Sequence, residues 1–279
     1  MPGRRDFLKI SGLGLAAVTT AGFTNTNDSN ITRERANYKF RLGMASYTFR
    51  NFSLEQALDM TQRLDLHRIS LKDVHLALDS SKEEIARAVA LCKAKGIELY
   101  GGGVIYMKNT ADVDNAFEYA KAAGMRIIIG VPNHELLGYV ERKVKDYDIK
   151  LAIHNHGPGD NLYPSAASAY EKIKDMDKRM GLCIDIGHTK RINRNPEQDL
   201  KDFFERVYDI HIKDVTAADQ SGAPCEIGRG VIDIPAFLGA VIMLGYTGTL
   251  ALEYEKDAKD PLPGAAESIG YLKGVLANI

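Results

Sequence analysis

The sequence predicts an α/β fold, a (β/α)8 or TIM barrel, over residues 38–279. Short apolar runs alternate there with longer segments of helical period, and the alternation repeats eight times, as a barrel of strands and helices requires. The alternative is an open doubly wound sheet, which often carries a Gly-x-Gly-x-x-Gly turn after its first strand. No such turn follows the first run, and Gly101-Gly102-Gly103 follows the third without opening a helix at that spacing. The barrel is therefore favoured.

The expected strands are short apolar runs of the kind that are buried on both faces in a barrel wall. They are FRLGMASY (40–47), HRISL (67–71), IELYGGGV (97–104), RIIIGV (126–131), KLAIHNH (150–156), GLCIDIG (181–187), YDIHIKD (208–214) and GTLALEY (248–254). The segments between them predict amphipathic helices at 53–64, 81–96, 112–124, 162–178, 197–206, 235–244 and 264–277. In the second of these segments, Ser81 is suited to cap the start and Gly96 to end the helix.

Residues 1–37 predict an export signal followed by a linker. The string GRRDFLK at 3–9 resembles the twin-arginine export motif; a disordered basic tail is the alternative. The weakly hydrophobic run 10–23 is rich in Gly, Ala and Thr, and it is shorter than the roughly 20 apolar residues that a membrane helix needs. Residues 24–37 are polar, as in a linker. We therefore expect recognition by the twin-arginine export machinery, no stable membrane span and a periplasmic location.

The charge balance and the cysteines argue against two classes of protein. The chain has 36 basic and 37 acidic residues and a net charge of −1, so no overall positive field draws in nucleic acid, and no nucleic-acid partner is expected. The three cysteines, Cys92, Cys183 and Cys225, are widely spaced and odd in number. They form neither a disulfide framework nor a Cys-x-x-Cys metal site, and we interpret them as buried or idle thiols.

Ionisable side chains stand near the ends of four consecutive expected strands. They are His154 and His156, Asp185 and His188, His211 and Lys213, and Glu253. Active sites of such barrels lie at the C-terminal ends of the strands, and buried charges are costly unless they are paired or bound to a metal. Each group alone could be a satisfied core residue. Together, their nitrogen and oxygen donors predict a site for one divalent metal ion.

Four strings in the second half of the chain carry a family resemblance. They are DIGH (185–188), HIKD (211–214), GRGVID (228–233) and LALEYE (250–255). They resemble the sugar isomerase/epimerase superfamily, which has the xylose-isomerase-like barrel, and the resemblance covers about residues 40–279. It implies one metal held by Glu, Asp, His and Glu from the fifth to the eighth strand. Asp185, His211 and Glu253 fall on the last three of these positions.

The fifth strand departs from this pattern, because His154 stands where the family has a glutamate. The implied ligands are therefore His154, Asp185, His211 and Glu253, and the implied ion is manganese or zinc. The histidine makes the site less anionic, which suits zinc or another late transition metal. In the epimerases of this superfamily two glutamates exchange a proton on opposite faces of a metal-bound sugar. Since one of them is replaced here, we expect a single-base isomerisation or an elimination, with Glu253 as ligand and base.

The remaining site residues are assigned from their positions. Lys72 ends the second expected strand and is a candidate acid or base; a salt bridge to Asp73 is the alternative. His156, His188 and Lys213 are expected to contact substrate. Arg229, in the GRGVID string, is expected to reach a substrate oxygen, unless it is a plain loop arginine.

The function expected from the sequence is that of a metal-dependent sugar isomerase/epimerase-like enzyme acting on a keto-sugar or keto-glycoside. The chain lacks a P-loop or a similar phosphate cradle, and an exported enzyme meets free sugars more readily than sugar phosphates. A lyase or hydrolase at the same site and a non-catalytic periplasmic sugar-binding protein are the alternatives. An endonuclease-IV-like repair enzyme is a weaker one, because such an enzyme needs a basic face for phosphates.

Overall fold

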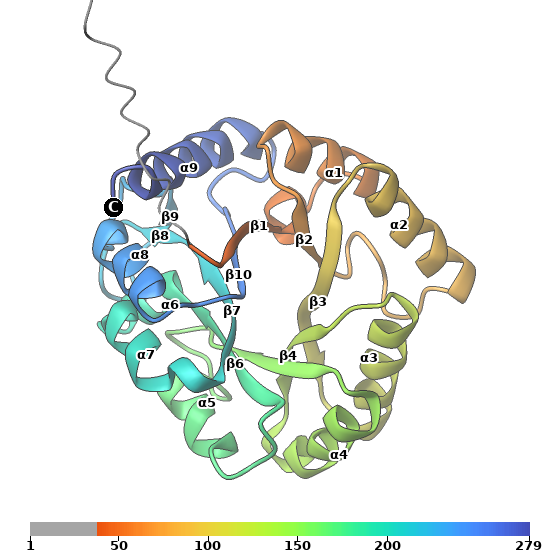
Figure 1. Ribbon diagram of the computed structural model, residues 1–279. Helices are drawn as coiled ribbons and strands as arrows, with labels where there is room; N and C mark the ends of the chain where they lie inside the picture. The colour runs from red at the N-terminus through yellow and green to blue at the C-terminus, as the bar shows by residue number, and fades with distance from the viewer. Residues whose placement is uncertain (1–37) are drawn as a thin grey trace, which may run out of the picture. The chain divides into compact units, whose positions relative to one another are not determined.

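The computed structural model describes residues 38–279, and the expected export signal and linker at 1–37 lie outside the described residues. Across the described part, eight parallel strands close into a barrel in the order β1-β10-β7-β6-β5-β4-β3-β2, with helices on its outside (Figure 1). The predicted (β/α)8 barrel is confirmed. The barrel strands are β1 (Arg41–Ala45), β2 (Arg68–Leu71), β3 (Glu98–Met107), β4 (Ile127–Pro132), β5 (Lys150–His154), β6 (Met180–Asp185), β7 (Val207–Ile212) and β10 (Thr249–Leu252).

Each expected strand overlaps an observed one, but five of them (β1, β5, β6, β7 and β10) end two residues earlier than expected. The changes in β5 and β6 affect candidate site residues. β5 stops at His154, so His156 lies in the loop that follows. β6 stops at Asp185 because α6 begins at the next residue, and the Asp185 side chain caps that helix by accepting a hydrogen bond from the His188 amide. Both changes occur at the C-terminal mouth of the barrel, where the candidate ligands stand.

The helices pack around the barrel. They are α1 (Leu54–Arg63), α2 (Lys82–Ala94), α3 (Thr110–Ala122), α4 (Leu137–Tyr147), α5 (Ala166–Ile173), α6 (Ile186–Arg191), α7 (Pro196–Phe203), α8 (Ile234–Met243) and α9 (Pro261–Leu276). The predicted cap at Ser81 is confirmed, since Ser81 and Glu84 form a reciprocal capping box. α4 and α6 were not predicted. α4 nevertheless carries a helical signal, because Leu137, Val140 and Val144 recur at helical spacing and are all buried.

A loop structure after β7 joins two of the strings noted in the sequence. β8 (Asp214–Val215) pairs with β9 (Pro224–Cys225) in a two-stranded antiparallel sheet. The buried Asp214 carboxylate accepts hydrogen bonds of 2.9 to 3.2 Å from four backbone amides, those of Val215, Gly228, Gly230 and Ile232. A side chain at Gly230 would not fit, because its Cβ would lie 2.1 Å from Asp214 Oδ1. Asp214 of HIKD thus holds the GRGVID loop in place.

Glu226, in the same loop region, gives a pH-dependent contribution to stability. Its carboxylate accepts hydrogen bonds of 2.8 Å from the Tyr254 hydroxyl and from Lys256 Nζ. The bond from Lys256, acting against burial, lowers the pKa of Glu226 from 4.5 to about 2. Because the folded pKa lies below the unfolded one, the stabilisation is complete above pH 4.5 and is lost as the pH falls towards 2.

Glu226→Gln is therefore expected to lower the free energy of unfolding at pH 7 by about 1–2 kcal/mol. This is less than the full pKa shift would give at about 1.4 kcal/mol per unit, because the half-exposed Lys256 is screened by solvent. Urea unfolding of both proteins at pH 7 and pH 2.5 measures the effect. The difference should shrink at the lower pH, and Glu205→Gln, at an exposed position without an ion pair in residues 38–279, should show neither effect. A difference that is independent of pH would contradict this assignment.

No helix in residues 38–279 is both long enough and apolar enough to cross a bilayer.

Candidate metal centre and active-site pocket

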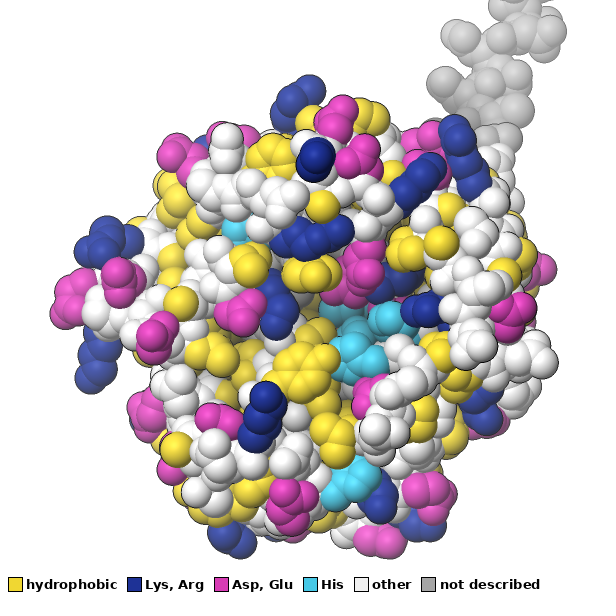
Figure 2. All heavy atoms as spheres, turned by 180° about the vertical axis from the view of Figure 1, so that it is seen from behind, with side chains coloured by type: hydrophobic (Ala, Val, Ile, Leu, Met, Phe, Trp, Pro, Cys, Tyr) yellow, Lys and Arg dark blue, Asp and Glu magenta, His cyan; other side chains and the backbone are white. Residues whose placement is uncertain are grey.

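Histidine and acidic side chains gather in a hollow on the face of the molecule opposite to that of Figure 1 (Figure 2). The hollow is a cavity of about 280 Å³ at the C-terminal ends of the strands. Its lining residues are Tyr47, Lys72, Val104, Tyr106, His154, His156, His188, Glu253 and Glu255. It therefore lies where active sites of such barrels are found.

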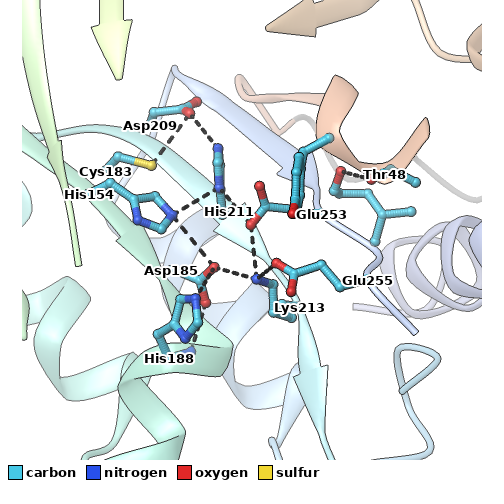
Figure 3. A network of polar contacts seen from close by, with 12 residues as sticks. Thr48, His154, Cys183, Asp185, His188, Asp209, His211, Lys213, Glu253 and Glu255 are labelled. Carbon is cyan, nitrogen blue, oxygen red and sulfur yellow. Dashed lines mark hydrogen bonds and ion pairs between the residues drawn. The ribbon is translucent and has the colours of Figure 1, made fainter. Parts of the chain in front are cut away.

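The four predicted metal ligands come together beneath this cavity. One donor atom from each of His154, Asp185, His211 and Glu253 lies within 4.8 Å of the others, and all four residues are buried. His154 Nε2 is 3.1 Å from His211 Nδ1 and 3.7 Å from Asp185 Oδ2. His211 Nδ1 is in turn 3.3 Å from Glu253 Oε2 (Figure 3). Two imidazoles and two carboxylates at these separations match the donor set that zinc, manganese and similar ions accept.

Unsatisfied polar atoms also favour a bound cation. His154 Nδ1 and His211 Nε2 are buried and have no hydrogen-bond partner within the described residues. The other ring nitrogen of each histidine makes the contacts with Asp185 and Glu253. Folded proteins leave few buried polar atoms without a partner, and such atoms often belong to a site that binds an ion or a water molecule. The residues thus fit a divalent ion, as the sequence predicted for the cofactor.

Lys213 lies in the middle of the acidic groups. Its ammonium is 3.0 Å from Asp185 Oδ2, 2.9 Å from Glu253 Oε2 and 2.6 Å from Glu255 Oε1, and its side chain is 2% exposed. Burial acts to lower the pKa of Lys213, but the three carboxylates raise it well above its usual value. The sequence predicted that this lysine contacts substrate. The structure places it instead as the counter-ion of the carboxylates, below the cavity wall.

Three of the four candidate ligands hold the protonation states that metal binding needs. The exception is His211: burial acts to lower its pKa, but Cys183 and Glu253 raise it well above the usual value, so it has to release a proton when it binds a metal. Burial lowers the pKa of His154 to about 3, so its imidazole is neutral at pH 7. Burial acts to raise the pKa of Asp185, but His188 and Lys213 bring it well below its usual value. For Glu253, burial acts in the same direction, and Lys213 and His211 again lower the pKa well below the usual range. A neutral imidazole and ionised carboxylates are the forms that bind metals.

The xylose isomerase-like TIM barrel family model matches residues 67–275, which is more than half of the chain. The chain belongs to the xylose isomerase-like TIM barrel family. No curated protein matches it.

Solved structures of the same fold include sugar epimerases. An uncharacterized protein from Parabacteroides distasonis is 26% identical with a TM-score of 0.68, and the match covers 85% of this chain and 99% of that one. An L-ribulose 3-epimerase is 17% identical with a TM-score of 0.70, covering 85% and 94%. A 3-keto-D-glucoside 4-epimerase from E. coli is 14% identical with a TM-score of 0.68, covering 85% and 100%. At these identities the two epimerases show the fold that they share with this chain.

In this xylose isomerase-like barrel, His156 and His188 form one wall of the pocket. Tyr106 Oη is 3.0 Å from His156 Nε2, and Asp160 Oδ2 is 3.2 Å from His156 Nδ1. The His156 ring centroid is 4.5 Å from that of His154 although β5 has already ended, so the two rings still lie on the same side. Burial lowers the pKa of His188 to about 4. Both histidines therefore line the pocket beside the candidate metal ligands, and their contact with substrate stays a prediction.

Lys72 and Glu255 also line the pocket. Lys72 donates a hydrogen bond of 2.6 Å to the Val104 carbonyl and lies 3.3 Å from Asp73 Oδ1, so it lines the pocket and also makes the salt bridge that was the alternative. Glu255 was not predicted as a site residue. Burial raises the pKa of its carboxyl, although Lys213 acts in the opposite direction. The spacing of Glu253 and Glu255 could have indicated it, since residues two apart at a strand end point the same way.

Arg229 lies away from the pocket. Its guanidinium forms a two-pronged ion pair with Glu267 of α9, with one contact of 2.7 Å, and its side chain is 62% exposed. It is absent from the described residues that line the cavity. The sequence placed it in the site because it stands in the GRGVID string. The backbone amides of that string instead donate hydrogen bonds to Asp214, and the Arg229 side chain points to Glu267.

Proposed function

We propose that this chain is a metal-dependent enzyme of the sugar isomerase/epimerase type, acting on a keto-sugar or keto-glycoside. The observation that supports this most is that His154 and Glu253, two of the four candidate ligands, also line the pocket. A small molecule in the pocket therefore reaches the metal centre. The epimerases of the same fold favour a sugar as that molecule.

A divalent ion bound by the four candidate ligands would polarise the carbonyl of a bound keto-sugar. Glu253 is the proposed base, because it is ionised and faces the pocket, and it removes a proton from the carbon next to that carbonyl. Glu255 and the Lys72 ammonium, which also line the pocket, are the proposed proton donors. His156 and His188 hold the hydroxyl groups of the sugar.

The size of the pocket favours one sugar ring over a longer saccharide. Its volume of about 280 Å³ is at the lower end of the range of about 300–1,000 Å³ for small-molecule sites. A glycoside therefore has to leave its second group outside the pocket.

Glu253→Gln is expected to reduce proton exchange at least about 100-fold, the lower limit for losing a general base. The measurement is incorporation of deuterium next to the carbonyl when a panel of keto-sugars and keto-glycosides is incubated with the protein in deuterated water. Removal of metal with a chelator should abolish exchange, and manganese or zinc should restore it. The surface variant Glu171→Gln, whose side chain is 64% exposed, serves as the matched control.

Exchange that persists in Glu253→Gln would refute the role of this residue as base. If sugars bind but no exchange is detected with any of them, a sugar-binding protein without activity is the correct description.

A lyase acting on a keto-glycoside is the second candidate. It is favoured by His154, because an imidazole that holds the metal is a poor replacement for the glutamate that would act as a second base. Removal of the same proton followed by loss of a neighbouring group needs no second base on the opposite face. Product analysis separates the two reactions, since elimination releases a smaller molecule and isomerisation does not.

We also propose that the protein is exported to the periplasm by the twin-arginine machinery. The string GRRDFLK at 3–9 supports this. Replacing both arginines with lysine is expected to retain the protein in the cytoplasm, and cell fractionation tests it. Unchanged export would contradict the proposal.

A further inference from the structure

We propose that Cys183 is a metal-binding residue which, with His154 and His211, forms a second, sulfur-containing position for a thiophilic ion such as zinc. The inference rests on the proposed metal dependence and specifies the kind of ion. It also changes the interpretation of Cys183, which the sequence left as a buried or idle thiol.

Cys183 points to the metal centre because of its place on β6. It precedes Asp185 by two residues, so both side chains lie on the same face of the strand. In the sheet, Cys183 is the partner of His154 on β5 and of Asp209 on β7. Donor atoms of His154, Cys183 and His211 lie within 4.8 Å of one another, and all three residues are buried.

Unpartnered nitrogen atoms supply the second observation. His154 Nδ1 and His211 Nε2 are buried without a hydrogen-bond partner in residues 38–279, and both side chains are at most 2% exposed. Asp209 Oδ2 lies 3.7 Å from His211 Nε2 and 3.6 Å from Cys183 Sγ. Figure 3 shows Cys183 and Asp209 on one side of His211, with Asp185 and Lys213 on the other. His211 Nε2, the Cys183 sulfur and the Asp209 carboxylate thus lie on the side of His211 that faces away from Lys213, with His154 within reach of the same group.

Lys213 makes the sulfur-containing position favourable compared with the position between the two carboxylates. Its ammonium already contacts Asp185 Oδ2 and Glu253 Oε2, the oxygen atoms that lie nearest the histidines. A divalent ion bound to both oxygens would lie close to a second cation, whereas an ion bound by Cys183 leaves these ion pairs intact. Imidazole and thiolate ligands suit zinc, while manganese prefers oxygen. Binding replaces the S–H bond with a metal–sulfur bond and releases the proton to the buffer.

The test uses the full chain, stripped of metal with a chelator and loaded with zinc or cobalt. X-ray absorption at the zinc edge is expected to show one sulfur at about 2.3 Å, and cobalt is expected to give a near-ultraviolet sulfur-to-metal charge-transfer band. Cys183→Ser should abolish both signals and lower the zinc affinity at least 10-fold, with the manganese affinity unchanged. Cys92→Ser, at another buried thiol in α2, is the matched control and should behave as the wild type.

A zinc shell made of nitrogen and oxygen only would overturn this proposal and leave the proposed function intact, with Cys183 as a packed thiol. Failure of the wild-type chain to bind zinc, cobalt or manganese would overturn both. Thermal unfolding shows whether Cys183→Ser folds. If it does not, the X-ray absorption spectrum of the zinc-loaded wild type tests the proposal by itself, through the presence or absence of a sulfur ligand.

Discussion

Replacing Lys213 with methionine is expected to lower the free energy of unfolding of the metal-free protein by about 3–5 kcal/mol, the usual loss when one partner of a buried ion pair is removed. The Lys213 ammonium is the shared counter-ion of Asp185, Glu253 and Glu255, at 2.6 to 3.0 Å. Without the ammonium, the three carboxylates lie close together in a buried region and lose their shared positive partner. Methionine keeps most of the volume of the side chain, so the loss reports the charge.

Urea unfolding in the presence of a chelator measures this loss. Zinc or manganese should then stabilise Lys213→Met more than the wild type, because a divalent ion can replace the missing positive charge. Lys145→Met is the control: Lys145 pairs with Glu141 at 3.0 Å on the surface of α4, with 49% of its side chain exposed, and its loss should cost no more than about 0.5 kcal/mol. Equal stabilisation of Lys213→Met and wild type by metal would show that the ion does not reach these carboxylates.

Asp214→Ala is expected to lower the free energy of unfolding by about 3–5 kcal/mol. Four backbone amides donate to this carboxylate, and each buried donor left without an acceptor costs about 1–3 kcal/mol. The amides of Gly228 and Gly230 are only partly buried and regain water, which limits the total. Asp214→Asn should lose less, because its amide oxygen can still accept some of the bonds.

Chemical denaturation measures the stability, and hydrogen exchange locates the change. The amides of Gly228, Gly230 and Ile232 should lose protection in Asp214→Ala while the barrel strands keep theirs. Asp219→Ala should change little, because within residues 38–279 the Asp219 side chain accepts hydrogen bonds only from nearby Ser221 on the surface. Full protection of the three amides in Asp214→Ala would show that the loop is held by other contacts.

The barrel could be predicted because its pattern is local. Each strand is a short apolar run, and each predicted helix has an apolar face, so the order of elements followed from neighbours in the sequence. α6 was missed although its start signal is local: it begins at Ile186, and Asp185 caps it by accepting a hydrogen bond from the His188 amide three residues on. α4 also has a local signal, because Leu137, Val140 and Val144 recur at helical spacing.

The site was predictable to the extent that strand ends place residues. His154, Asp185, His211 and Glu253 were expected at neighbouring strand tips, and they do lie within reach of one ion. The contact partners of each side chain were harder to predict from the sequence. Arg229 stands in a motif of the family yet pairs with Glu267, because the direction of a loop side chain depends on what lies beside the loop.

The sequence by itself determined the strand order, the end of the barrel that carries the chemistry and the residue types gathered there, because period and spacing are properties of the chain. Only the tertiary structure decided which atoms meet. Lys213 and Glu255 are far apart in sequence, yet their charged groups are 2.6 Å apart, and Cys183 reaches the histidines only because β5, β6 and β7 are neighbours in this register. Closure of the barrel brings such groups to one buried point, where the loss of water makes every unpaired charge or donor costly.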